Sequence, residues 1–108
     1  MIDSYKFLEL KERLKILRDT LSRYEIKLAE IENARGVLER TDGKVYRVIG
    51  DLIFEVDRDE ARDYLEKSEL AFKSQVEKLK EEIEKVSSEL RKMENEIAGK
   101  MAGMNAGV

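Results

Sequence analysis

Two ladders of apolar residues, each stepping alternately by four and three positions, constrain the fold of this chain more than any other feature. Such a ladder keeps one narrow seam of a helix facing a partner helix, as in a coiled coil. The first ladder contains Phe7, Leu10, Leu14, Leu17, Leu21, Tyr24, Leu28, Ile31 and Leu38, and the second contains Phe72, Val76, Leu79, Ile83, Val86, Leu90, Met93 and Ile97. Two such helices joined by a chain reversal are expected to fold back on each other.

The composition favours a narrow seam bordered by charge over a large globular core. Of the 108 residues, 42% are charged and only 6% are aromatic. The net charge is −3, whereas a nucleic-acid-binding protein more often carries a basic stripe, so we expect no nucleic-acid partner. No apolar run is long enough for a membrane span and no signal peptide is visible, so we expect a cytoplasmic protein with no membrane partner.

Nothing in the sequence indicates an enzyme. The chain has no Cys and no His, which removes the commonest nucleophile-base pairs and metal ligands. Acidic pairs such as Glu81–Glu82 lie among Lys and Arg residues and are typical of a solvated helix surface. We therefore expect no catalytic residue, no metal and no cofactor.

The two predicted helices cover residues 4–40 and 58–98, and neither contains proline. Arg35 and Glu69 occupy seam positions that are otherwise apolar. A charge in the seam either sets the helix register or keeps its stem packed while its head reaches water, and for Arg35 we expect the second. The small residues and methionines of 99–108 predict a flexible tail.

A β-hairpin is predicted between the helices, over residues 45–56. Two β-branched and aromatic runs flank Gly50–Asp51, a two-residue turn with Gly in first place. This turn pairs Val45 with Val56 and Ile49 with Leu52. An isolated hairpin is marginal in water, and open apolar edges aggregate. We therefore expect hairpins of several chains to pair, through Val45, Tyr46, Val48, Ile49, Gly50, Leu52, Ile53, Phe54 and Val56. Packing of the hairpin onto the helix ends of a monomer or dimer is the alternative.

With the hairpin at the bend, both termini are expected at the far end of arms about 45 to 60 Å long, at ~1.5 Å per residue. Apolar residues there form a candidate client-binding tip, because exposed apolar patches usually bind a partner and Met adapts to varied surfaces. They are Met1, Ile2, Tyr5, Phe7, Leu8, Ile97, Met101 and Met104. Fraying with no binding role is the alternative.

The layout and the stretch from Gly43 to Val56 resemble the β-type subunit of prefoldin, an archaeal and eukaryotic co-chaperone. The resemblance is strongest at Val45–Tyr46, at Val48–Ile49–Gly50 and at the helix start in 57–65, and a single hairpin indicates the β class. It implies a mainly α fold: one prefoldin-like domain over 1–108, a long antiparallel two-helix coiled coil with a single β-hairpin at the bend.

The resemblance also implies a function and partners. Two α-type and four β-type subunits would form a hexamer whose hairpins build a β-structured platform. The distal tips would bind unfolded proteins and deliver them to a group II chaperonin without ATP. The N-terminal arm is shorter than is usual for the family and lacks a Gln-rich start. A structural or adaptor subunit of another multiprotein complex is the alternative function.

Overall fold

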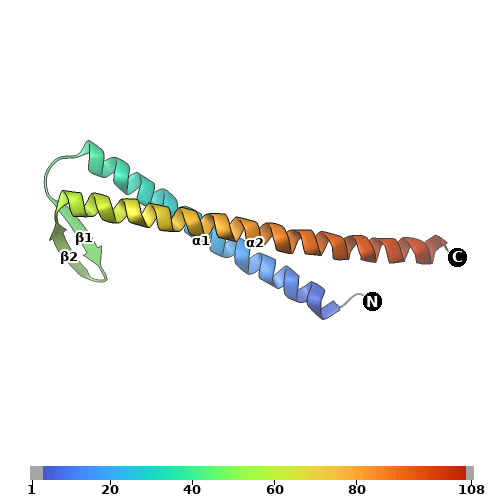
Figure 1. Ribbon diagram of the computed structural model, residues 1–108. Helices are drawn as coiled ribbons and strands as arrows, with labels where there is room; N and C mark the ends of the chain where they lie inside the picture. Colours follow the sequence, from blue (N-terminus) through green and yellow to red (C-terminus); the bar gives the residue numbers. More distant parts are fainter. Residues whose placement is uncertain (1–3, 107–108) are drawn as a thin grey trace. The chain divides into compact units, whose positions relative to one another are not determined.

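The computed structural model describes residues 4–106, with side chains for residues 4–103. Its elements follow in the order α1 (Ser4–Arg40), β1 (Val45–Ile49), β2 (Leu52–Val56) and α2 (Arg58–Ala106), as Figure 1 shows. Two long helices with an antiparallel two-stranded hairpin between them confirm the predicted fold class.

The start of α2 matches its local sequence, whereas its end lies beyond the predicted one. The carbonyl of Asp57 accepts a hydrogen bond from the amide of Ala61 at 2.9 Å, and Asp59 and Glu60 in the first turn suit the positive end of the helix dipole. We predicted the helix to end at residue 98, but α2 continues to Ala106. Gly99 and Gly103 each cost only about 1 kcal/mol relative to Ala in a helix, and the Ala, Met and Lys residues around them favour it.

The hairpin has the register that its turn predicts. Val45 pairs with Val56, Tyr46 with Glu55, Arg47 with Phe54, Val48 with Ile53, and Ile49 with Leu52. Gly50 has φ 60°, and no other residue of the turn has a positive φ. This combination belongs to a type II′ turn, whose twist matches that of the flanking strands. Only glycine adopts this backbone without strain, so Gly50 sets the register.

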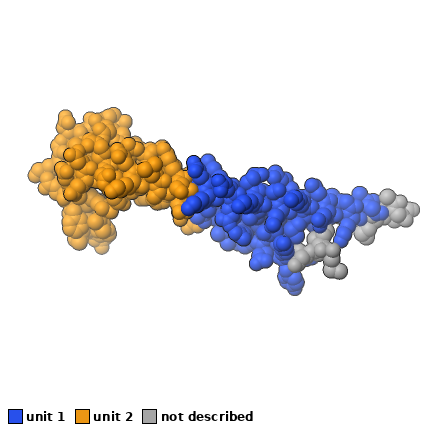
Figure 2. Space-filling view, viewed as in Figure 1, with its two compact units in different colours: residues 1–22, 77–108 blue, residues 23–76 orange. Residues whose placement is uncertain are grey.

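The described chain divides into two compact units, which Figure 2 distinguishes by colour. Unit 1 contains the first part of α1, up to Ser22, and the part of α2 from Glu77 onward. Its core is formed by Leu10, Val86 and Leu90, and four half-buried residues pack against them: Phe7, Leu14, Leu17 and Met93. All seven are ladder residues, so the predicted seam is the core of this unit.

Unit 2 contains residues 23–76, and therefore the rest of both helices and the hairpin. Ile31, Leu38 and Val76 are its buried apolar residues. The rings of Tyr24 and Phe72 meet edge to face, with centroids 5.5 Å apart, which is a favoured geometry for aromatic pairs. The seam continues through this unit, but one of its buried side chains is charged: Glu69, which is only 8% exposed.

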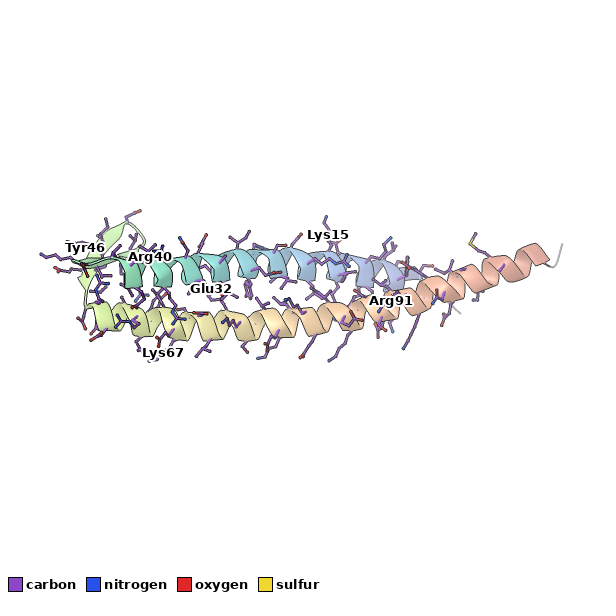
Figure 3. The ribbon with its side chains drawn as sticks, turned by 90° about the horizontal axis from the view of Figure 1, so that it is seen from above. Lys15, Glu32, Arg40, Tyr46, Lys67 and Arg91 are labelled. Atoms are coloured by element: carbon purple, nitrogen blue, oxygen red, sulfur yellow. The ribbon has the colours of Figure 1, made fainter. Side chains whose placement is uncertain are left out.

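Among the described residues, neither helix has a segment long and apolar enough to cross a membrane. The same part of the chain contains no cluster of three or more acidic side chains placed to hold a metal ion. Apart from Glu69, the described charged residues of both helices are at least partly exposed, and Lys15 on α1 and Lys67 on α2 project from the outer sides of their helices (Figure 3).

Candidate functional site

Most of the exposed large apolar side chains of unit 2 lie in the hairpin. Val48 and Ile53, which face each other across the two strands, are 67% and 68% exposed. Four more large side chains of the hairpin are also exposed: Tyr46, Ile49, Leu52 and Phe54. Scattered apolar residues are normal on a protein surface, but a contiguous patch marks an interaction site. Six of the predicted assembly residues are therefore exposed on the two strands, whereas Val45 and Val56 are half-buried.

One end of the hairpin is held against the helices. The guanidinium of Arg47 lies 4.0 Å from the centroid of the Tyr64 ring on α2, a cation–π contact. Val45 and Val56, at the base of the two strands, are half-buried. Arg58 donates hydrogen bonds to the carbonyl of Leu38 and, at 3.1 Å, to that of Gly43, and so braces the connection between α1 and β1. The hairpin is therefore anchored at its base, while its turn end stays exposed.

A groove of about 580 Å³ runs between β1 and the two helices of unit 2. Its lining is largely apolar and includes Val37 and Leu38 of α1, Val45 of β1, and Tyr64 and Leu65 of α2. Val37 and Tyr64 are themselves exposed. The apolar surface of the hairpin thus continues onto the helices that flank it.

An ion-pair network crosses the seam in unit 2. Arg35 of α1 binds Glu69 of α2, and Lys73 lies 2.9 Å from the other carboxylate oxygen of Glu69. The side chain of Arg35 is 38% exposed, so its head reaches water in part, as expected, and it also binds the buried carboxylate of Glu69 across the seam. A guanidinium nitrogen of Arg35 is also 3.5 Å from a carboxylate oxygen of Glu66. Charges at both seam positions were visible in the sequence, but the pairing depends on how the two helices align.

The contacts in this network shift the acid–base equilibria of its members. Hydrogen bonds from Lys73 and Arg35 hold the pKa of Glu69 below its ordinary value. A second pair, Arg62 with Glu39 at 2.7 Å, lowers the pKa of Glu39 in the same way. Both carboxylates are therefore charged at every pH at which an unpaired glutamate is charged, and they stay charged at lower pH.

The candidate client-binding residues divide into exposed and packed side chains within unit 1. Tyr5 is 86% exposed, and Leu8 and Met101 are also exposed. Phe7 instead packs against the core of the unit, and Ile97 is half-buried. Met1 and Ile2 lie outside the described residues. The backbone of Met104 belongs to α2, but its side chain is outside the described ones.

Comparisons with known proteins agree with this architecture. The family model described as "Prefoldin subunit" matches residues 4–103. The crystal structure of the prefoldin β2 subunit from Thermococcus strain KS-1 is similar, with 31% sequence identity and a TM-score of 0.75. The match covers 84% of this chain and 99% of the other.

A second similar structure is that of the prefoldin β subunit from the same strain. It has 19% identity and a TM-score of 0.79, covers 87% of this chain and 84% of the other, and at this identity shows likeness in fold alone. No curated protein sequence matches the chain. The family match over nearly all of the described residues, together with the single hairpin, shows that the chain belongs to the prefoldin family and is a β-type subunit.

Proposed function

We propose that this prefoldin-type co-chaperone subunit assembles through its hairpin with an α-type prefoldin subunit, in a hexamer of two α and four β chains. The assembly binds unfolded proteins through exposed apolar residues of unit 1 and delivers them to a group II chaperonin. It acts in the cytoplasm and without ATP. The observation that carries this proposal is the unpartnered apolar hairpin in a chain of the prefoldin family.

The hairpin supports the assembly part of the proposal. Six large apolar side chains are exposed on ten strand residues, and two strands alone are marginally stable in water. Both strands are edge strands, since the sheet contains only β1 and β2. Edges of this kind pair with strands of other chains unless charge or proline protects them. Pairing with other prefoldin hairpins would cover the edges and bury the apolar faces.

Exposed side chains of unit 1 support the client-binding part. Tyr5, Leu8 and Met101 offer apolar contacts of different shapes, and the flexible thioether of Met adapts to irregular partner surfaces. Weak, adaptable contacts of this kind suit clients that share no sequence. Phe7 is less suited to this role because it packs against the core of unit 1.

The test measures whether the assembled protein prevents aggregation. A triple variant, Tyr5→Ser with Leu8→Ser and Met101→Ser, is assembled with an α-type prefoldin subunit. Light scattering then follows the aggregation of two unrelated denatured proteins. We expect the variant to keep its assembly but to suppress aggregation several-fold less well than the parent, because each substitution removes an exposed apolar contact from the proposed client surface.

Ile16→Ser provides the matched control, because Ile16 is an exposed apolar residue of α1 in the same unit but outside the proposed surface. This variant should protect both clients as well as the parent. If the triple variant also protects both clients fully, the assignment of client binding to these residues is wrong. If the parent assembly protects neither client, a structural or adaptor role in another complex replaces the proposed function.

A further inference from the structure

Arg35 and Glu69 are the two charged residues in a seam that is otherwise apolar. The four-three spacing runs from Phe7 to Leu38 on α1 and from Leu65 to Ile97 on α2. All the remaining positions of this seam hold apolar or aromatic residues. The two exceptions bind each other across the seam within unit 2. The two charged seam residues are thus each other's partner. This distinguishes them from the ion pairs scattered over the surface, such as Arg13 with Glu82.

The pair is built into the seam. The side chain of Glu69 is 11% exposed, whereas that of Arg35 is 38% exposed. Lys73, one turn further along α2, binds the second oxygen of the Glu69 carboxylate. Both oxygens of this buried carboxylate therefore have cationic partners, and one of the partners comes from the other helix.

Apolar seams by themselves do not determine which helix pairs with which. The leucine and isoleucine ladders of α1 would also fit a second copy of α1, and those of α2 a second copy of α2, because the seam residues are alike. A parallel pair of α1 helices would place Arg35 against Arg35 of the other copy. A parallel pair of α2 helices would place two Glu69 carboxylates together. Only the pairing of α1 with α2 joins opposite charges.

We propose that Arg35 and Glu69 determine the pairing partner of the helices: they select α1 with α2 over pairing between like helices of two chains. The connection through the hairpin already limits sliding of α1 along α2 within one chain. Pairing between chains during folding and assembly is the competing arrangement. Buried ion pairs often add little to stability compared with apolar residues of similar size, and fixing one arrangement is their best-attested role. This inference is independent of client binding and of the chaperonin.

The test reports the pairing partner by cross-linking. The chain has no cysteine, so introduced cysteines are unique. Glu39 of α1 and Arg62 of α2 form an exposed ion pair at 2.7 Å, so Glu39→Cys with Arg62→Cys places two thiols on opposite helices, next to the native seam. A short bismaleimide cross-linker then joins them within one chain when α1 pairs with α2. It joins two chains through the same introduced position in each when like helices pair. A denaturing gel separates the products, and mass spectrometry of the linked peptides identifies which positions are joined.

Two full-length seam variants are made in this cysteine background: the apolar pair Arg35→Leu with Glu69→Leu and the exchanged pair Arg35→Glu with Glu69→Arg. The surface ion pair is removed as the control, by Arg13→Leu with Glu82→Leu. We expect the apolar pair to unfold at the same or a higher temperature and to form several-fold more cross-links between chains. The exchanged pair and the control should keep the low fraction of the parent.

Each other outcome overturns the proposal. If the apolar pair keeps the parental fraction of cross-links between chains, the charges do not select the partner. If the exchanged pair forms as many of these cross-links as the apolar pair, opposite charge across the seam is not what matters. If the apolar pair unfolds at a clearly lower temperature, the ion pair acts by stabilising the unit.

Discussion

The helical seam and the hairpin contain the same kinds of side chain, but the chain buries them in one and exposes them in the other. In unit 1, Leu10, Val86 and Leu90 lie between two helices of the same chain. In the hairpin, Val48 and Ile53 lie in solvent. The helices thus find their partner within one chain, whereas the hairpin does not. This difference predicts that folding of the helices and the proposed assembly through the hairpin are separable.

Breaking the hairpin should give the largest effect. Val48→Asp with Ile53→Asp places two carboxylates opposite each other on the exposed strands and opposes the burial of this face in an assembly. We expect no complex with an α-type prefoldin subunit by size-exclusion chromatography with light scattering, while circular dichroism shows the helix content of the parent.

Leu70→Asp is the matched control for this variant. Leu70 is 69% exposed, as exposed as Ile53, but it lies on α2 outside the hairpin. This control should assemble like the parent. Normal assembly of the doubly substituted hairpin would show that the exposed strands are not the assembly site.

Breaking the seam should give the next largest effect, which is a loss of stability. Leu90→Ala removes a buried side chain from the core of unit 1 and leaves a cavity, so we expect a loss of about 2–5 kcal/mol in the free energy of unfolding. Leu8→Ala removes the same atoms from an exposed site and should change the free energy of unfolding by at most about 0.5 kcal/mol. Urea unfolding followed by circular dichroism measures both. Equal losses would contradict the description of this seam as the core.

A smaller effect should appear with pH in unit 2. The pKa of Glu69 is lower in the folded chain than in the unfolded one, so the folded state binds protons less readily. The resulting stabilisation is fully present above the ordinary glutamate value of 4.5 and is lost as the pH falls through the lower folded pKa. The pKa of Glu39 is also lowered, by its hydrogen bond from Arg62, so Glu39 stabilises the folded chain over the same pH range.

Urea unfolding at neutral pH and at several values below 4.5 measures this dependence. Glu69→Gln should make stability fall less steeply with acid than in the parent, because the variant lacks a carboxylate whose pKa is lower in the folded chain than in the unfolded one. Glu77→Gln, at an exposed position of the same helix, is the control for the loss of a carboxylate. If the free energy of unfolding depends on pH in the same way in Glu69→Gln and in the parent, the pKa of Glu69 is not lowered by folding.

The sequence was sufficient for features that depend on local spacing. The four-three ladders predicted which face of each helix is covered, and Gly50–Asp51 predicted every cross-strand pair of the hairpin, because a two-residue turn leaves one register. The end of α2 was less predictable. Glycines at 99 and 103 indicate a helix end, but their cost is small and the helix continues to Ala106.

Features that depend on the alignment of two distant segments could not be predicted. Arg35 and Glu69 were each recognisable as charges in a seam, but their contact requires the antiparallel pairing to be known residue by residue. Phe7 belongs both to a ladder and to the apolar terminal region, and only the packing shows that it lies against the core. Surface exposure of Tyr5 and Leu8 likewise follows from which helix face is covered.

The molar mass of the chain in solution, alone and mixed with an α-type prefoldin subunit, tests the central claim most directly, namely that the hairpin is an assembly element. Multi-angle light scattering measures it. We expect the mixture to give one hetero-oligomer, with the mass of two α and four β chains, and amide hydrogen exchange in β1 and β2 to slow in it. A chain that stays monomeric in both samples, with equally fast exchange in its strands, would contradict the account.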